Sequence, residues 1–178
     1  MNVIIEPSFF PGQEWTEIDQ ERSFDCGQCG IVPMHGLARW RSRRSDKRVV
    51  VTNGVFDAFH GGHADLLIRA RELGDVLLVG LNSDRSARQL RGLTVAWQPW
   101  QLQRAELLLA LRSVDAVCIF DQPQATAFLQ EALPTIYVKG ENYTIDALDP
   151  DERQMLLELG SDIRFIPFRW RSTPPPGP

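Results

Sequence analysis

From Val49 onward the chain alternates short β-branched and aliphatic runs with segments of helical periodicity, and this alternation constrains its fold more than any other feature. Such an alternation is typical of parallel strands joined by crossover helices. Five strands are predicted, at residues 49–52, 76–81, 116–120, 135–138 and 163–166. Most are continuous apolar runs, as expected of strands buried on both faces. The pattern therefore predicts an α/β fold, a Rossmann-like doubly wound sheet of five parallel strands.

The first crossover helix is predicted from a stripe of apolar residues between the first two strands. Its members have helical spacing: Leu66, Leu67, Ala70 and Leu73. Gly74 follows them at the position where a residue in the left-handed conformation would end the helix. The segment therefore reads as one complete strand–helix–strand unit.

Further helices are predicted from residues that favour helix starts. Ser83 is expected to cap a helix at 84–91, and another helix is expected at about 101–112. Asp121 and Asp149 are each followed closely by a proline, a combination that favours the start of a helix. Two later helices are therefore expected to begin at these aspartates.

The two ends of the chain lack this alternation. Residues 1–48 mix prolines and glycines with scattered aromatic residues, and they are predicted to form an N-terminal arm or a small irregular subdomain. Residues 49–173 would form the main domain, and residues 174–178 an extended proline-rich tail. The arm ends in a basic stretch at 39–48, which we interpret as a solvated linker, the alternative being a site for nucleic acid or an acidic partner.

Composition excludes several classes of protein. The chain is 43% hydrophobic and 24% charged, which is typical of soluble globular proteins, and no apolar run approaches the roughly 20 residues that span a bilayer. The first residues do not resemble a secretory signal, so we expect a cytoplasmic protein without a membrane partner. A net charge of −4 argues against nucleic acid as a partner.

The three cysteines favour a reducing compartment over a disulfide framework. Cys26, Cys29 and His35 could supply three of the four ligands of a zinc ion, but no fourth ligand is evident. Cys118 lies in a predicted strand and is interpreted as a small core residue. We therefore expect no protein-bound metal cluster.

The residues most suggestive of chemistry directly follow the first strand. The segment 52–63 reads TNGVFDAFHGGH and contains two of the three histidines, His60 and His63. It joins the carboxyl end of a strand to the start of a helix, which is where doubly wound sheets bind ligands and where free helical N–H groups attract anions. Gly54 and Gly62 would let the backbone approach a phosphate closely. The segment thus predicts a phosphate-binding site.

This segment resembles the signature of the H-x-G-H nucleotidyltransferases, a cytidylyltransferase-like superfamily, through Gly54-x-Phe56-Asp57-x-x-His60-x-Gly62-His63. Further segments are similar to one branch and occur in the same order: 79–84, 90–92, 103–106, 112–115 and 138–143. That branch is typified by the heptose 1-phosphate adenylyltransferase domain of lipopolysaccharide-precursor synthesis. The resemblance covers roughly 49–173, which makes it far more specific than the H-x-G-H tetrapeptide alone.

The resemblance implies an enzyme of carbohydrate biosynthesis, a nucleotidyltransferase with a nucleoside triphosphate and a phosphorylated small molecule as its partners. It would transfer a nucleoside monophosphate from ATP or CTP to a sugar 1-phosphate or a related compound and release pyrophosphate. The phosphate nucleophile is already mostly dianionic at neutral pH, so no general base is needed and the protein's task is electrostatic. Mg²⁺ is the cofactor expected from this reaction class.

The resemblance also implies roles for individual residues. The catalytic residues would be His60, His63 and Lys139. The nucleotide-binding residues would be Thr52, Asn53, Gly54, Phe56, Asp57, Gly62, Arg104, Ser172 and Thr173. The substrate-binding residues would be Asp57 and Arg91.

The chain departs from the branch at three places, one of which is 93–97, where the basic residue that relatives often carry before the third helix is missing. Residues 141–143 read Glu-Asn-Tyr where relatives tend to have Gly-Asp-Tyr. Three prolines, 174–176, follow the Ser-Thr pair at 172–173, so a final helix that could bind phosphate through its N–H groups is not expected there. An alternative is therefore a catalytically weakened protein of this fold that serves as a structural or interaction subunit. The N-terminal arm is also a candidate interface for a homodimer or a larger assembly.

Overall fold

The computed structural model describes residues 30–91, 100–141 and 143–167 of the chain. Its centre is a sheet of six strands in the order β1-β4-β3-β2-β5-β6, with every pair of neighbours parallel. The strands are β1 (Gly30–Ile31), β2 (Val49–Gly54), β3 (Val76–Asn82), β4 (Ala116–Phe120), β5 (Ile136–Gly140) and β6 (Asp162–Ile166). The predicted parallel α/β sheet is confirmed, and the number of strands is corrected from five to six because β1 extends the sheet beside β4.

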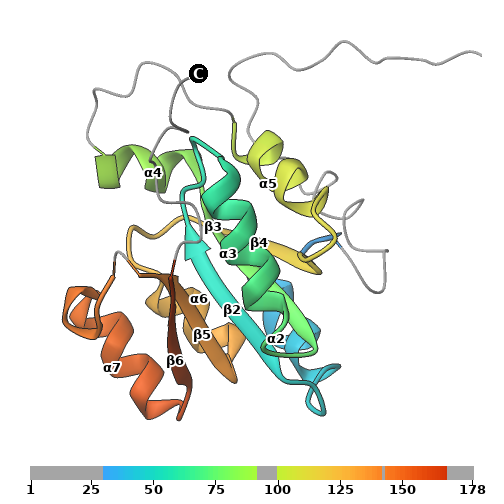
Figure 1. Cartoon of the computed structure of the whole chain (residues 1–178), viewed down its shortest axis with the longest axis vertical. Coiled ribbons are helices and arrows are strands. Elements are labelled where there is room, and N and C mark those ends of the chain that lie inside the picture. Colours follow the sequence, from blue (N-terminus) through green and yellow to red (C-terminus); the bar gives the residue numbers. More distant parts are fainter. Residues whose placement is uncertain (1–29, 92–99, 142, 168–178) are drawn as a thin grey trace, which may run out of the picture.

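Helices cover both faces of the sheet (Figure 1). They are α2 (Met34–Ser42), α3 (Gly61–Arg71), α4 (Asp84–Arg91), α5 (Gln101–Leu109), α6 (Thr126–Ala132) and α7 (Pro150–Glu158), and a 3₁₀ turn, η1 (Ile145–Ala147), precedes α7. In Figure 1, α3 and α5 lie in front of the sheet, whereas α2 and α6 lie behind it. This arrangement is the doubly wound fold that the alternation of strands and helices predicts.

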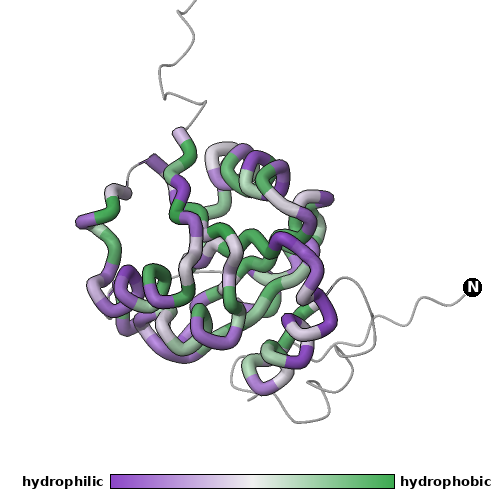
Figure 2. The backbone as a smooth tube through the Cα atoms, turned by 90° about the horizontal axis from the view of Figure 1, so that it is seen from below, coloured by the Kyte–Doolittle hydropathy of each residue, from purple (hydrophilic) through white to green (hydrophobic). Residues whose placement is uncertain are grey.

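Two apolar clusters hold the helices on the sheet, one on each face. The first joins α2, α6 and α7 to the sheet through side chains such as Leu37, Phe128 and Leu156, which are all fully buried. The second joins α3 and α5 to the opposite face through residues such as Leu67 and Leu108. Figure 2 shows the same organisation, with hydrophobic stretches inside and hydrophilic stretches outside. Both faces of the sheet are thus covered by helices, and its carboxyl edge is the part that a functional site can use.

The segment before β2 contributes to this core. Residues 30–48 belong to the segment predicted to be irregular, and this prediction is corrected because they contain β1 and α2. Leu37 of α2 is fully buried, and the Arg41 guanidinium donates a hydrogen bond from Nε to the carbonyl oxygen of Leu133, 3.1 Å away. The described part of that segment therefore packs against the main domain, whereas residues 1–29 lie outside the described residues.

Several predicted helix boundaries are confirmed and others are corrected. Helix α4 has the predicted bounds, and the Ser83 hydroxyl accepts a hydrogen bond from the Ser86 N–H at 3.1 Å, as a helix cap should. Asp149 likewise caps α7 through the N–H groups of Asp151 and Glu152. Helix α5 ends at Leu109, three residues before the predicted end.

Asp121 does not begin α6, which starts only at Thr126. The N–H of Ala125 donates to the Glu152 carboxylate at 2.6 Å, so a side chain distant in sequence stabilises this helix start. Gly74 is not in the left-handed conformation either, since the only positive-φ glycines of the described chain are Gly30 and Gly160. It is instead packed so closely that a Cβ atom there would lie 2.5 Å from the carbonyl oxygen of Arg48.

Two observations bear on the expectations from composition. Cys118 is fully buried, as predicted for a core residue, and burial raises the pKa of its thiol. Cys26 and Cys29 lie outside the described residues. Among the helices of the described ranges, none is long and apolar enough to span a membrane.

Candidate active site

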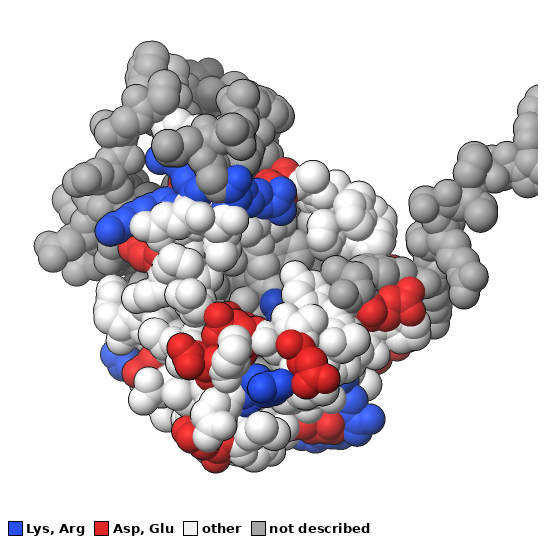
Figure 3. Space-filling model, turned by 90° about the vertical axis from the view of Figure 1, so that its left-hand side faces the viewer, with Lys and Arg blue, Asp and Glu red and all other residues white. Residues whose placement is uncertain are grey.

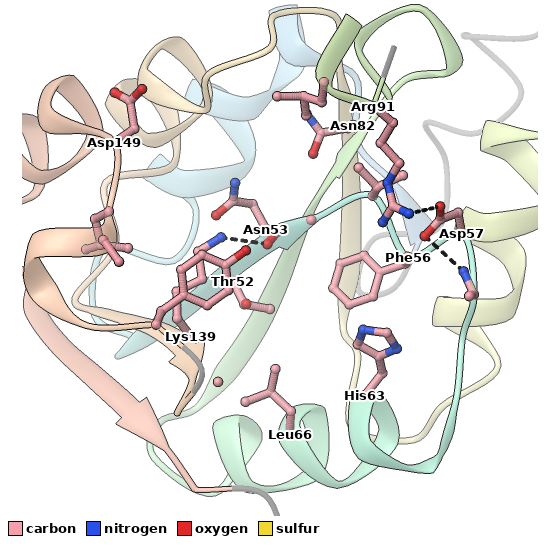
Figure 4. Close-up of a pocket in the computed structure, with 18 of the residues that line it drawn as sticks. Thr52, Asn53, Phe56, Asp57, His63, Leu66, Asn82, Arg91, Lys139 and Asp149 are labelled. Carbon is pink, nitrogen blue, oxygen red and sulfur yellow. Dashed lines mark hydrogen bonds and ion pairs between the residues drawn. The ribbon is translucent and has the colours of Figure 1, made fainter. Parts of the chain in front are cut away.

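A cleft of about 930 Å³ opens at the carboxyl edge of the sheet, above the ends of β2, β3 and β5 (Figure 4). Ten of the predicted site residues line it: Thr52, Asn53, Gly54, Phe56, Asp57, His60, Gly62, His63, Arg91 and Lys139. β2 pairs with β3 on one side and β5 on the other, so the chain changes direction across the sheet at this point. Doubly wound folds bind their ligands at such switch points.

His60 is held in a defined orientation at the start of α3. It is the N-cap of this helix, and its Nδ1 atom accepts a hydrogen bond from the N–H of Gly62 at 3.1 Å. Because Nδ1 is the acceptor, the proton of the neutral imidazole is on Nε2. His60 therefore offers an N–H donor beside the N-terminus of α3, where the helix dipole already favours an anion.

His63 lies one helical turn further on and stacks against His60. The ring centroids are 4.0 Å apart with an interplanar angle of 24°. Phe56 and Phe59 flank the His63 ring, with centroids at 5.4 and 5.6 Å. Burial, together with the charge that His60 can carry, lowers the pKa of His63, while Asp57 opposes the shift. The environment therefore favours the neutral form of the His63 side chain. Its Nδ1 is buried and has no hydrogen-bond partner within the described ranges, so Nε2 is the ring nitrogen that can meet a ligand.

The turn that follows β2 carries a strained residue and an ion pair. Phe56 has a φ of 52°, a left-handed conformation that is uncommon for a bulky side chain and is often found at functional sites. The next residue, Asp57, accepts a hydrogen bond from the N–H of Ala58 at 3.0 Å and pairs with the Arg91 guanidinium at 2.7 Å. The ion pair joins this turn to α4 across one end of the cleft (Figure 4).

Lys139 lies on the other side of the cleft, near the end of β5 (Figure 4). Only 9% of the residue is exposed, and its ammonium group donates a hydrogen bond to the carbonyl oxygen of Asn53 at 2.9 Å. Burial lowers the pKa of Lys139 to about 8, although the charge of Glu152 opposes the shift. An ammonium group with few protein partners and little water around it attracts a phosphate strongly.

Arg104 is the predicted site residue that the structure does not place in the cleft wall. Its side chain is fully buried and pairs with Asp84 at 2.7 Å. It also donates hydrogen bonds to the carbonyl oxygens of Asn82 and Val55, which belong to the end of β3 and the turn after β2. Arg104 thus connects the end of β3 to the turn after β2 through hydrogen bonds. Ser172 and Thr173 lie outside the described residues.

The borders of the cleft carry opposite charges. Helix α4, on one side, exposes Arg85, Arg88 and Arg91. On the opposite side Asp149 and Glu152 line the cleft. Figure 3 shows basic side chains along one border of a hollow and acidic side chains along the other. The α4 border therefore favours phosphate groups, whereas the opposite border offers acceptors for hydrogen-bond donors beside the phosphate-attracting Lys139.

Part of the lining was not predicted from the sequence: Asn82, Leu90, Tyr143, Asp149 and Glu152. Asn82 is the last residue of β3. It could have been predicted, as the residues after β2 were, because doubly wound sheets bind ligands at the carboxyl ends of their strands. Asp149 was assigned only a helix-capping role. No sequence pattern predicts that Glu152 lines the cleft, because its position there depends on how α7 packs against α6.

The fold and the site together define a class of protein. A parallel doubly wound sheet, a helix N-terminus with two stacked imidazoles and a buried lysine across the cleft are the features of a nucleotide-binding α/β domain. The family model described as cytidylyltransferase-like matches residues 51–173. The chain belongs to this cytidylyltransferase-like family, as its sequence predicts.

Curated relatives are bifunctional proteins named HldE. The chain is 40% identical over 132 residues to HldE of Koribacter versatilis and 47% identical over 132 residues to HldE of Campylobacter curvus. The match spans 74% of this chain in both cases, but only 26% and 27% of those relatives. The chain thus spans about a quarter of the length of the curated relatives it matches.

Solved structures share the fold. The lipopolysaccharide core biosynthesis protein of Thermoplasma volcanium matches with a TM-score of 0.56 and 24% identity, over 71% of this chain and 99% of that protein. The pantoate-beta-alanine ligase of Francisella tularensis, in complex with beta-gamma ATP and beta-alanine, matches with a TM-score of 0.52 and 15% identity, over 81% of this chain and 69% of the ligase. At these identities the likeness concerns the fold alone.

Proposed function

We propose that the chain transfers a nucleoside monophosphate from ATP or CTP to a sugar 1-phosphate or a related phosphorylated small molecule. The observation that carries the proposal is the stacked pair of His60 and His63 at the N-terminus of α3, with the buried Lys139 across the same cleft. Family membership and the similarity to HldE proteins support it. Such a reaction is a step of carbohydrate biosynthesis, and we place it in the cytoplasm, where nucleoside triphosphates are abundant.

In the proposed reaction an oxygen of the acceptor phosphate forms a bond to the α-phosphorus of the nucleoside triphosphate. The bond between that phosphorus and the bridging oxygen breaks, and pyrophosphate leaves with the electron pair. No proton has to be removed from the nucleophile, since the phosphate is mostly dianionic. The protein therefore has to stabilise negative charge. The N–H donor of His60, an Nε2–H donor of His63, the positive end of the α3 helix dipole and the Lys139 ammonium can do so.

Magnesium would be held mainly by the phosphates of the substrates. Within the described ranges, no group of three or more histidine, cysteine or acidic side chains is arranged to bind a metal ion. Asp57 lines the cleft and fits as a single carboxylate contact, because its present partners, Arg91 and a backbone N–H, both hold it in place. Magnesium commonly uses one or two carboxylates together with substrate phosphates, and it would neutralise charge on the leaving pyrophosphate.

Pyrophosphate release tests this proposal. The protein is incubated with Mg²⁺, each nucleoside triphosphate and a panel of acceptors that includes heptose 1-phosphate, mannose 1-phosphate and glycerol 3-phosphate. We expect release with one pair, and we expect His63→Ala to lower kcat by about 10²- to 10³-fold, the usual effect of removing one preorganised donor. His35→Ala, which alters a histidine outside the cleft, is the matched control. No release above the level of His63→Ala with any pair would contradict the proposal and favour a non-catalytic role.

A further inference from the structure

Asn82 occupies a position in the cleft that none of the roles above explains. It is the last residue of β3, only 2% of it is exposed, and it lines the cleft. Its side-chain nitrogen donates to the Ser86 hydroxyl at 2.8 Å and approaches the carbonyl oxygen of Gln122 at 3.5 Å. A buried amide held in this way has a fixed orientation.

The hydrogen bonds determine which end of the Asn82 amide faces the ligand. The Ser86 hydroxyl donates its single proton to the carbonyl oxygen of Gln122, 2.7 Å away, so it can only accept a hydrogen bond from Asn82. Gln122 likewise offers only a carbonyl oxygen. The amide nitrogen must therefore face these two acceptors, and a flipped amide would bring oxygen against oxygen. Oδ1 is left pointing into the cleft, as Figure 4 shows.

Oδ1 of Asn82 has no donor within the described ranges of the chain. The nearby Arg104 guanidinium donates to the backbone oxygen of Asn82 and not to its side chain. An acceptor that opens onto a cleft and lacks a protein donor is satisfied by water or by a donor on the ligand. The cleft thus presents an acceptor-only group, which favours hydroxyl or amino groups and disfavours another oxygen anion.

The surroundings of Asn82 indicate which ligand would supply that donor. Leu90 and Arg91 of α4 line the cleft with it, and Figure 4 shows Arg91 and Asp57 on the same side as Asn82. This end of the cleft lies across from Lys139 and Asp149 (Figure 4). Arg91 is 48% exposed and can exchange its contact with Asp57 for a phosphate. A cation beside a neutral acceptor matches a molecule that carries a phosphate and hydroxyl groups close together.

We propose that Asn82 sets acceptor specificity by accepting a hydrogen bond, through Oδ1, from a hydroxyl group of the phosphorylated acceptor. The inference rests on the proposed nucleotidyl transfer and narrows its acceptor to polyhydroxylated phosphates such as sugar phosphates. Ser86 is a positioning residue, because its hydroxyl holds the amide in the orientation that exposes Oδ1.

Kinetics of Asn82→Leu test the proposal, with ATP and heptose 1-phosphate as substrates. Loss of one hydrogen bond to a neutral group is expected to raise KM for the acceptor about tenfold and leave KM for ATP within about twofold. Ser86→Ala should change the same parameter by a smaller factor, since the amide can then flip. Gln89→Leu makes the same chemical change at an exposed position of α4 outside the cleft lining, and it should match the wild type.

Deoxy analogues make the test independent of any general damage to the site. Mannose 1-phosphate and its monodeoxy analogues are compared for the wild type and Asn82→Leu. For one analogue the difference between the two proteins should vanish, because the hydroxyl that Asn82 receives is missing. A difference that persists with every analogue, an unchanged acceptor KM, or an increase confined to KM for ATP would each overturn the proposal.

Binding measurements separate this inference from the proposed function. Calorimetry with a non-hydrolysable ATP analogue and mannose 1-phosphate gives the acceptor affinity without turnover. If the wild type releases no pyrophosphate but binds mannose 1-phosphate about tenfold more tightly than Asn82→Leu does, nucleotidyl transfer fails and the role of Asn82 stands. If the wild type and the variant bind mannose 1-phosphate equally, or neither binds it, the role of Asn82 is refuted.

Discussion

The buried ammonium of Lys139 should make catalysis sensitive to alkaline pH. Burial lowers the pKa of Lys139 from the ordinary 10.5 to about 8, which corresponds to roughly 3 kcal/mol lost by the charged form. Only the charged form attracts the triphosphate, so kcat/KM for ATP, which reports the free enzyme, should fall as pH rises above about 8. At pH 9.5 it should lie about thirtyfold below its plateau, whereas a lysine with an ordinary pKa would still be mostly charged.

Two variants separate Lys139 from other groups that titrate in this range. Lys139→Arg carries a guanidinium that stays charged, so its profile should remain flat to pH 9.5 even if its plateau is lower. Glu152→Gln removes the negative charge that raises the pKa of Lys139, so its decline should begin at a lower pH than in the wild type. A wild-type profile that declines only near pH 10.5, or an identical decline in Lys139→Arg, would refute this reasoning.

Three further predictions concern the supports of the site and the metal. Arg104→Met should destabilise the fold by about 2 kcal/mol in denaturant unfolding, because it leaves Asp84 and two backbone oxygens without their partner. An unchanged free energy of unfolding would contradict the role of Arg104 in connecting these segments. Gly80→Ala should cost about 1–3 kcal/mol in the same measurement, since its Cβ would lie 2.5 Å from the Phe128 ring, and an effect below 0.5 kcal/mol would show that the ring can yield. Chelation with EDTA should abolish pyrophosphate release and added Mg²⁺ should restore it; activity that persists in EDTA would exclude the proposed cofactor.

The sequence predicts those parts of the fold that local patterns determine. All five predicted strands are present, because continuous apolar runs bounded by turns leave a parallel sheet little alternative. Asp149 begins α7 because its carboxylate reaches N–H groups only two and three residues away. The strand β1 was missed because two residues, Gly30 and Ile31, carry no period that can be recognised.

Features that depend on distant partners could not be predicted from the sequence. The start of α6 is set by Glu152, 27 residues away, and not by the nearby Asp121. Arg104 resembles a phosphate ligand in sequence, yet the contacts with Asp84 and two carbonyl oxygens that bury it form only once the sheet is assembled. The predicted residues of the 52–63 segment do line one cleft, because a single strand end and a helix start bring them together. The predicted roles of these residues, the division into domains and an assembly through the arm stay predictions.

The fate of labelled phosphorus tests the central claim most directly. ATP labelled at the α-phosphorus and ATP labelled at the γ-phosphorus are each incubated with heptose 1-phosphate, Mg²⁺ and the wild-type protein, and the products are separated by chromatography. Nucleotidyl transfer predicts that the α label moves into the sugar product and the γ label into pyrophosphate. Transfer of the γ label to the sugar, or release of AMP with no labelled sugar product, would contradict the account.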